Sequence, residues 1–570
     1  MPLIINLEII NNLAHSGLTY FVEESFMNNF DFIIIGAGSA GCVLADKLSA
    51  CGKYQICLLE AGPKDSHWSI HMPIGIIELI KDNVRNWQFH SAPESSQNNR
   101  EIFNPRGKTL GGSSSINAML YTRGQKEDYD HWEALGNKGW SFNDVLPYFK
   151  NTQHQERGES EFHGIGGALN VADSRSKPPI HDDFISSAQQ AGFVFNNDFN
   201  SENQEGVGYY QVTQKHGQRC SAAKAFLTPN LHRENLTVIT DAQVQKILIN
   251  ENKTATGVCY NVKGKQHNIF VKKEVLLSAG AFNSPQLLML SGVGSKAELT
   301  KHNIPLVHEL SGVGQNLQDH PDIVIVNKHN RHDLLALRPR AAWWLFTQAL
   351  KYFPLSSNNK TVNDNRCGIL TSAVAESGGF IKSKPDLLRP DLQLHFIPAA
   401  FDDHGRNLKM QLNYGISLHA CLLRPKSRGS VTLYGNKASL HPKITLNMLS
   451  HEDDQQDMIQ AVKVARSILS QSPLSENNGS EIFPGDKTQT DEEILMFLKN
   501  KANTIYHPVG TCKMGNDDMA VVDQTLKVYG LNKLRVIDAS IMPTLISGNT
   551  NAPTIMIAAK IADVILAEYS

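Results

Sequence analysis

The sequence predicts an α/β fold, and three observations carry that prediction. A short β-branched run leads into the pattern Gly36-x-Gly38-x-x-Gly41, and a helical pattern follows it. A second short apolar run ends in Glu60. Farther along the chain, strands such as 392–396 alternate apolar and polar residues, which is typical of a sheet with one solvent-facing side.

The glycine pattern has the residues that a strand, a tight turn and a helix need to bind a pyrophosphate. Gly36 permits the turn, Gly38 lets the backbone approach the phosphates, and Gly41 lets the helix pack on the strand. The helix N-terminus would face the phosphates with free N–H groups. Glu60 follows Gly41 by nineteen residues and is placed to hydrogen-bond a ribose hydroxyl. Together these features indicate dinucleotide binding rather than an ordinary glycine-rich turn.

Length and composition exclude several classes of protein. A chain of 570 residues suggests about two to four domains. The net charge of −2 predicts no nucleic-acid partner, and no apolar run reaches the about 18–20 residues that span a bilayer. Eight cysteines without paired spacing fit reduced thiols in the cytoplasm. Residues 1–26 carry no signal-peptide pattern, and we expect translation to start at Met27 or 1–26 to be a loosely attached extension.

A second glycine-rich stretch follows Arg106. Five small residues, 111–115, stand side by side before the run Ile116-Asn117. Such a loop offers backbone N–H groups and hydroxyls at close range, which suits a pyrophosphate or a flat ring. The alternative is a flexible linker.

Three long motifs resemble those of the glucose–methanol–choline (GMC) flavin-dependent oxidoreductases, and the resemblance extends over essentially the whole chain from about residue 28. The motifs are Gly107-Lys-x-Leu-Gly-Gly-Ser-Ser-x-Ile-Asn117, Gly280-Ala-x-x-Ser284-Pro-x-Leu-Leu-x-x-Ser291-Gly-Val-Gly294, and His507-Pro-Val-Gly-Thr-Cys-Lys-Met-Gly515 followed by Val536-Ile-Asp538-Ala-Ser540 and Asn549-Thr-Asn551-Ala-Pro-Thr554. Within the family, the chain is most similar to the branch of acceptor-linked aliphatic alcohol dehydrogenases and choline dehydrogenases.

The resemblance implies a Rossmann-like FAD-binding domain and a substrate-binding domain with a largely antiparallel sheet. Segments 28–155, 213–320 and 503–570 would form the FAD-binding domain, and the last of them would carry the catalytic histidine. Segments 156–212 and 321–502 would form the substrate-binding domain. The active site would lie between the two domains, where ligand pockets are common.

The cofactor implied by the resemblance is FAD rather than NAD. Some relatives bond the flavin covalently to a histidine, but the matching position here is Asn104, so we expect a non-covalent FAD. By motif match, the residues that would hold it are Gly36, Gly38, Ser39, Gly41, Glu60, Gly112, Ser113, Asn117, Val244, Asp538 and Ala539.

Alcohol oxidation by a flavin sends a hydride from the carbinol carbon to flavin N5 and needs a base for the hydroxyl proton. Histidine suits this role because its ordinary pKa of about 6.5 leaves it neutral at working pH. The family match assigns the base to His507, and Asn551 would donate a hydrogen bond to the substrate oxygen as charge develops. Without the resemblance, His507 would be a loop residue before a proline and Asn551 a turn residue.

Other groups of polar residues carry less weight. His395 with Asp402, Asp403 and His404 fits no tight ligand spacing, so we expect no metal. The acidic run 452–454 reads as the first turn of a helix. Three further histidines, His302, His308 and His320, are expected to be structural.

The expected substrate is a small primary alcohol, aliphatic by resemblance, with a quinone or another electron acceptor. Choline dehydrogenase is the alternative, but choline-oxidising relatives place a glutamate where this chain has Asp322. A quaternary ammonium group needs a carboxylate and an aromatic cage. Asp322 is therefore either a short cation-binding acid or a solvent-exposed loop residue.

The run 338–353 mixes tryptophan and phenylalanine with arginine and lysine. This composition suits a helix lying on a membrane surface, where the protein would meet a quinone. We therefore expect a cytoplasmic protein that contacts the inner membrane face peripherally. A lid helix packed on the substrate domain is the alternative.

The sequence leaves other functions of the same fold open. These are a hydroxynitrile lyase, a light-driven decarboxylase and a non-catalytic flavoprotein. It also leaves open oxidase activity and the oligomeric state.

Overall fold

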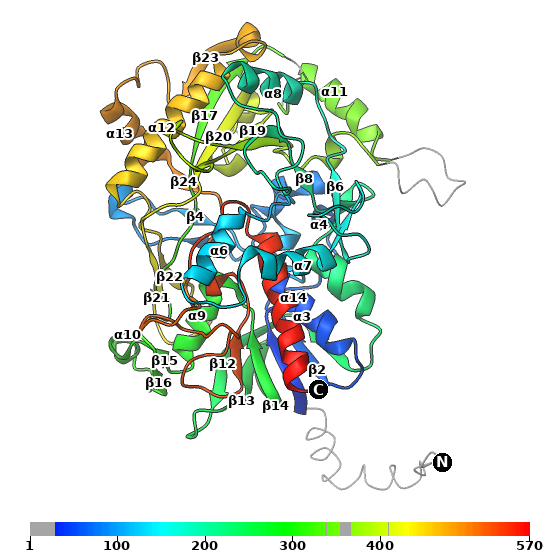
Figure 1. The fold of residues 1–570 in the computed structure, drawn as a ribbon, viewed down its shortest axis with the longest axis vertical. Coiled ribbons are helices and arrows are strands. Elements are labelled where there is room, and N and C mark those ends of the chain that lie inside the picture. Colours follow the sequence, from blue (N-terminus) through cyan, green and yellow to red (C-terminus); the bar gives the residue numbers. More distant parts are fainter. Residues whose placement is uncertain (1–28, 332, 337–338, 354–365, 408–409) are drawn as a thin grey trace, which may run out of the picture.

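The computed structural model describes residues 29–331, 333–336, 339–353, 366–407 and 410–570. Within these ranges, two seven-stranded sheets organise the chain, one in the lower and one in the upper half of Figure 1. This arrangement confirms the expected α/β class with a second, antiparallel sheet. The expectation for residues 1–26 lies outside the described residues.

The first sheet is the nucleotide-type sheet. Its strand order is β11-β2-β1-β14-β13-β12, with β25 beside β14; the bounds are β1 Asn29–Ile35, β2 Ile56–Leu59, β11 Leu236–Ile239, β12 Ala242–Ile249, β13 Ala255–Val262, β14 Lys265–Leu277 and β25 Leu534–Val536. The pairs among β11, β2, β1, β14 and β25 are parallel, and β12, β13 and β14 pair antiparallel. Every residue of β2 is buried, as expected for a parallel strand covered on both faces.

Helices from distant parts of the sequence pack together on this sheet. The C-terminal helix α14, Asn551–Glu568, lies against α3, Ser39–Ser49, and against α7, Phe142–Thr152 (Figure 1). Before α7 the chain forms a separate helix, α6, Lys126–Ala134. The break has a local cause, because Gly136 and Gly139 adopt positive φ values and Ser141 caps α7.

The second sheet has the order β23-β17-β20-β19-β18-β7, with β24 beside β17, and all its pairs are antiparallel. Its strands are β7 Gly206–Tyr209, β17 Pro321–His329, β18 Ser377–Ile381, β19 Leu392–Ile397, β20 Gly415–Leu422, β23 Asn478–Phe483 and β24 Asn503–Thr504. One face packs under α8, Ile180–Gln190, and α12, Glu452–Leu469, with α13, Asp491–Lys501, beside α12.

The expected solvent-facing side of this sheet is not observed. All residues of β19 and β20 are buried. Leu392, Leu394 and Phe396 join the core under the helices, whereas His395 and Ile397 line an internal cavity. The alternation predicted from 392–396 therefore separates a core face from a cavity face.

Smaller elements complete the fold. The remaining helices are α4 Trp68–His71, α5 Ile76–Leu79, α9 Gly280–Leu290, α10 Lys296–Lys301 and α11 Pro339–Leu350. The short strands are β3 Phe89–His90, β4 Phe103–Asn104, β5 Gln153–Gln155, β6 Leu169–Asp173, β8 Gln211–Val212, β9 Gln214–Lys215, β10 Gln218–Arg219, β15 Val293–Gly294, β16 His308–Glu309, β21 Ser430–Leu433 and β22 Pro442–Thr445.

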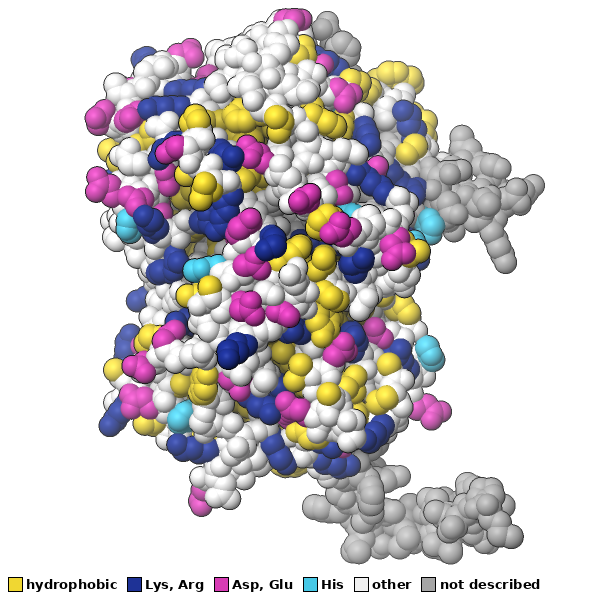
Figure 2. Space-filling model, viewed as in Figure 1, with side chains coloured by type: hydrophobic (Ala, Val, Ile, Leu, Met, Phe, Trp, Pro, Cys, Tyr) yellow, Lys and Arg dark blue, Asp and Glu magenta, His cyan; other side chains and the backbone are white. Residues whose placement is uncertain are grey.

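The surface agrees with the small net charge. Figure 2 shows acidic and basic side chains interspersed over the visible face, with no large field of one sign. Among the described residues, no helix combines the length and the apolar character needed to cross a bilayer.

Candidate active site

One cavity of about 360 Å³ lies where the carboxyl ends of the parallel strands meet the inner face of the second sheet. Such an edge is the usual ligand position in a doubly wound α/β sheet. The cavity is lined by His507 and Asn551 and by all but one of the expected cofactor residues: Gly36, Gly38, Ser39, Glu60, Gly112, Ser113, Asn117, Val244, Asp538 and Ala539. The structure therefore gathers residues from four distant parts of the sequence around one space.

The two glycine loops form a narrow cradle at the N-terminus of α3. Gly112 has a φ of +52°, and a Cβ on it would lie 2.7 Å from the Cα of Gly38. A Cβ on Gly38 would meet nothing within 4 Å, so this residue faces open space. Gly41 does not line the cavity; a Cβ there would lie 1.9 Å from the carbonyl oxygen of Gly36. Gly41 thus serves helix–strand packing, and Gly38 and Gly112 leave the backbone open to a phosphate-bearing group.

Glu60 stands at the end of β2, at the wall of this cradle. Its carboxylate accepts hydrogen bonds from the backbone N–H groups of Ala37, at 3.0 Å, and Gly62, at 2.9 Å. Burial raises the pKa of Glu60 to about 7, although these N–H groups act in the opposite direction. A buried acid at this position fits a ribose hydroxyl, which can donate to it.

Asp538, one of the expected cofactor residues, uses its side chain within the protein. Its carboxylate accepts from the backbone N–H groups of Gly280 and Ser540, both at 2.8 Å, and from the Ser284 hydroxyl at 2.6 Å. The side chain therefore holds two loops together at the cavity edge.

The second glycine loop is held by a buried arginine that sequence reasoning missed. Arg219 donates to the Asn117 side-chain oxygen at 2.8 Å and to the carbonyls of Asn117 and Ser114. Burial lowers the pKa of Arg219 to about 9. The position of Asn117 thus depends on a residue that no motif marked.

His507 is buried, with 8% of its surface exposed, and three groups orient it. Its Nδ1 lies 3.0 Å from Nδ1 of His320, its Nε2 lies 3.1 Å from Nδ2 of Asn549, and its backbone N–H donates to Asp319 at 2.8 Å. His320, which was expected to be structural, contacts the expected base directly.

These contacts determine which nitrogen of His507 carries the proton. His320 Nε2 lies 3.1 Å from the carbonyl oxygen of Leu423 and 3.2 Å from that of Ile546, and carbonyls only accept. His320 is neutral because burial lowers its pKa to about 3, so its Nδ1 is the acceptor. His507 therefore carries its proton on Nδ1 and presents the lone pair on Nε2.

The electrostatic surroundings keep His507 neutral. Burial lowers the pKa of His507 well below its ordinary value, and His320, His395 and Arg106 act in the same direction. Arg106 is also buried, which lowers its pKa to about 10, and its guanidinium donates to the carbonyl of Tyr506 at 2.6 Å. A neutral imidazole with a free Nε2 lone pair is the form that can accept a proton.

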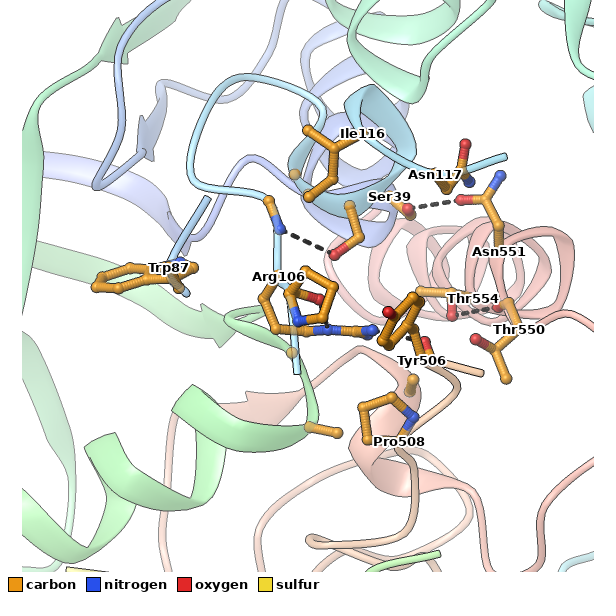
Figure 3. A pocket seen from close by; sticks show the side chains of 18 of the residues that line it. Ser39, Trp87, Arg106, Ile116, Asn117, Tyr506, Pro508, Thr550, Asn551 and Thr554 are labelled. Carbon is orange, nitrogen blue, oxygen red and sulfur yellow. Dashed lines mark hydrogen bonds between the residues drawn. The ribbon is translucent and has the colours of Figure 1, made fainter. Parts of the chain in front are cut away.

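Asn551 and Asn549 point to different partners. The side-chain oxygen of Asn551, at the start of α14, accepts from the Ser39 hydroxyl at 2.7 Å, so the two helix N-termini meet across the cavity (Figure 3). The amide of Asn549 contacts His507, and its oxygen accepts from Thr122 and Gln393. Sequence reasoning missed Asn549, although the Asn-Thr-Asn run offered both residues.

Asp322 is not a solvent-exposed loop residue. It lies on β17 with 2% of its surface exposed, and its Oδ2 is 2.7 Å from Nδ1 of His419. One oxygen of this carboxylate is therefore paired, and Asp322 does not line the cavity. No cluster of three histidine, cysteine or carboxylate side chains in the described part of the chain could hold a metal ion.

The glycine cradle at the edge of the parallel sheet fits a dinucleotide cofactor, and the buried histidine lies in the same cavity. Family models described as GMC oxidoreductase match residues 30–322 and 425–558. The chain belongs to the GMC oxidoreductase family, and it is an oxidoreductase that binds FAD.

Individual relatives agree with this assignment. The chain is 47% identical to alcohol dehydrogenase [acceptor] of Pseudomonas putida, over 94% of this chain and 96% of the relative. It is 41% identical to the mitochondrial choline dehydrogenase of Mus musculus, over 94% and 89% of the two chains. The crystal structure of a formate oxidase superposes with a TM-score of 0.85 at 27% identity and covers 95% of this chain and 99% of its own.

Proposed function

We propose that the protein oxidises a primary alcohol, aliphatic in character, to an aldehyde and passes the electrons to a quinone-type acceptor. The observation that carries this proposal is the tautomer of His507, whose Nε2 lone pair is available in the cavity as a base. Similarity to the alcohol dehydrogenase [acceptor] of Pseudomonas putida supports an alcohol as the substrate and a separate electron acceptor.

The chain's own groups account for the proton. In the proposed reaction, the alcohol O–H takes the place of the Asn549 N–H at His507 Nε2 and donates its proton there. His507 Nδ1–H continues to donate to His320, so the cation that forms keeps a hydrogen-bond acceptor. FAD, when bound, supplies the two-electron acceptor for this oxidation.

Asn551 is the proposed donor to the substrate oxygen. Because its amide oxygen is occupied by the Ser39 hydroxyl, its Nδ2 is the group left to donate. A preorganised amide donor of this kind stabilises negative charge that develops on oxygen. Asn549 is a second candidate for this role, since its Nδ2 already reaches His507 Nε2.

Choline is the alternative substrate, favoured by similarity to the choline dehydrogenases. Against it stands the position of Asp322, which pairs through Oδ2 with His419 and does not line the cavity. We therefore place a neutral alcohol ahead of choline.

The test is anaerobic mixing of the holoenzyme with octanol, benzyl alcohol or choline while the flavin absorbance is followed. Bleaching by octanol, with fast reoxidation by a quinone and slow reoxidation in air, is the expected result. If choline alone bleaches the flavin, the proposed activity becomes that of a choline dehydrogenase. No bleaching by any of the three would contradict alcohol oxidation and favour a non-redox reaction such as that of a hydroxynitrile lyase.

We also propose that FAD is held without a covalent bond. Asn104 is fully buried, its amide donates to the carbonyl of Ile102 at 2.8 Å, and it does not line the cavity. An amide side chain offers no nucleophile for a flavin. Acid precipitation should release the whole flavin content into the supernatant, and flavin retained in the pellet would contradict this.

A peripheral membrane contact through 338–353 is part of the same proposal, although residue 338 lies outside the described residues. On α11 and just beyond it, Trp343, Phe346, Leu350 and Phe353 are exposed at helical spacing, and Figure 2 shows hydrophobic side chains in this region. Vesicles of phosphatidylglycerol and phosphatidylethanolamine should float with the wild type and less with W343S/F346S. If the wild type and W343S/F346S float to the same extent, the proposed membrane contact through 338–353 is contradicted.

A further inference from the structure

Two imidazoles lie side by side on the inner face of the second sheet. His395 on β19 and His419 on β20 are paired directly across the antiparallel strands, so both side chains lie on the same face. Each is 4% exposed, and both line the cavity that contains His507. This wall of the cavity is therefore polar, which an unsubstituted alkyl chain does not require.

Both rings have hydrogen-bonding capacity that the described residues do not use. Nδ1 of His395 and Nε2 of His419 are buried without a hydrogen-bond partner among those residues. The other nitrogen of His419, Nδ1, lies 2.7 Å from Oδ2 of Asp322 and is engaged by that contact. Nε2 is therefore the nitrogen of His419 that is left for a ligand.

His395 supplies the complementary capacity. Burial lowers its pKa to about 3, so its ring is neutral and has one N–H donor and one acceptor nitrogen. Its ring stacks on Tyr210 at a centroid distance of 5.7 Å, which holds its plane. Both rings line the cavity, and each has a nitrogen that no described residue uses.

The walls near this pair are apolar. Ala373, Val374, Ala375 and Ile397 line the cavity, and Phe401 packs edge-on against His419 at 5.9 Å. A ligand that reaches both His507 and the histidine pair would thus place carbon atoms along these walls and polar groups at its ends.

We propose that the His395–His419 pair binds a second hydroxyl group of the substrate, so that diols are preferred over plain alkanols of the same length. A hydroxyl offers one donor and two acceptor positions, which matches what the two rings present. A quaternary ammonium group matches less well, because the nearby carboxylate of Asp322 does not line the cavity. This inference rests on the proposed alcohol oxidation for the reacting end.

A site built to bind a substrate hydroxyl rejects the analogue that lacks it, since its own buried polar groups then lose their partner. We expect kcat/KM for hexanediol to exceed that for hexanol by about 10²-fold with a quinone acceptor. Binding of a diol to the oxidised holoenzyme should also perturb the flavin spectrum at lower concentration than hexanol does.

Three variants test the assignment. H419F keeps the ring shape, removes both nitrogens, and should reduce the diol-to-alkanol ratio to near unity. H395F should reduce the same ratio and leaves the Asp322–His419 pair intact, which keeps the test available if H419F does not fold. H267F is the matched control, because His267 stacks on Tyr260 at the edge of the first sheet and does not line the cavity.

The outcomes separate the two proposals. Bleaching of the flavin by hexanol and hexanediol with equal efficiency would overturn the second-hydroxyl site alone, as would a ratio unchanged in both H419F and H395F. No bleaching by either series would contradict alcohol oxidation itself. If choline is turned over faster than the diol, the histidine pair binds a cation instead. This result would overturn the second-hydroxyl site.

Discussion

Nδ1 of His320 lies 3.0 Å from Nδ1 of His507, and the two rings stand at 87° to each other. Because Nε2 of His320 is bound to two main-chain carbonyls, only its Nδ1 can accept, and the proton between the rings belongs to His507. His320 therefore acts as a positioning residue: it selects the tautomer in which His507 Nε2 is free to take a proton.

Replacing the base should abolish rapid flavin reduction. We expect H507A to lower the rate of anaerobic reduction by an alcohol by about 10²-fold or more, since general-base catalysis contributes that much. The flavin content should equal that of the wild type. Stopped-flow absorbance measures the rate, and a rate within a few-fold of the wild type would remove His507 from its assigned role.

Replacing His320 should act through the proton of His507. In H320F no acceptor faces His507 Nδ1, both tautomers become populated, and we expect the reduction rate to fall by about 10²-fold. The neutral His320 accepts from His507 Nδ1–H and so stabilises the protonated form of His507. Without this acceptor the pKa of His507 should fall further, and the acid limb of the pH profile should move to lower pH.

The control for H320F is H302Q, at a histidine paired with Glu298 that does not line the cavity. This variant should leave both the rate and the pH profile unchanged. A lower rate in H320F with an unshifted acid limb would indicate a packing defect rather than a change of tautomer.

The wild-type pH profile follows from the same geometry. The active form of His507 is neutral, and its pKa in the folded protein lies well below 6.5 because the ring is buried. Lowering the pH through 6.5 should therefore leave kcat/KM unchanged, and activity should decline only at lower pH, where the imidazole becomes protonated. An acid limb at or above pH 6.5 in initial-rate measurements would contradict this.

The glycine cradle predicts a loss of cofactor without a general loss of structure. A Cβ in G112A would lie 2.7 Å from the Gly38 backbone and push the two loops apart, so bound FAD should fall to a small fraction of the wild-type content. G52A is the matched control: its φ is also positive, at +69°, but its Cβ would meet nothing within 4 Å. It should keep its flavin and lose about 1 kcal/mol of stability. Equal flavin content in the two variants, measured by absorbance after gel filtration, would refute the cradle.

Much of the cofactor side could be predicted because the signals are local. The turn at Gly36, the open backbone at Gly38 and the acid at Glu60 follow one another along the chain at spacings that a strand–turn–helix unit imposes. The break between α6 and α7 also has a local cause, because Gly136 and Gly139 lie between the two helices. A pattern of apolar residues does not reveal this break.

The catalytic side was predicted only in part because its contacts are made between distant strands and loops. His320 and His507 are separated by 187 residues, and Asp322 and His419 by 97. No spacing in the sequence indicates which histidine accepts, which donates, or that Asp322 is buried in a strand.

By itself the sequence determined the α/β class, and its long motifs indicated the GMC family and, through that resemblance, FAD and His507 as the expected base. Only the tertiary structure decided the tautomer of His507, the separate partners of Asn549 and Asn551, and the pairing of His395 with His419 on one cavity wall. The physical reason is that a proton's position depends on which donors and acceptors meet within hydrogen-bond distance, and the packing of the two sheets brings those groups together.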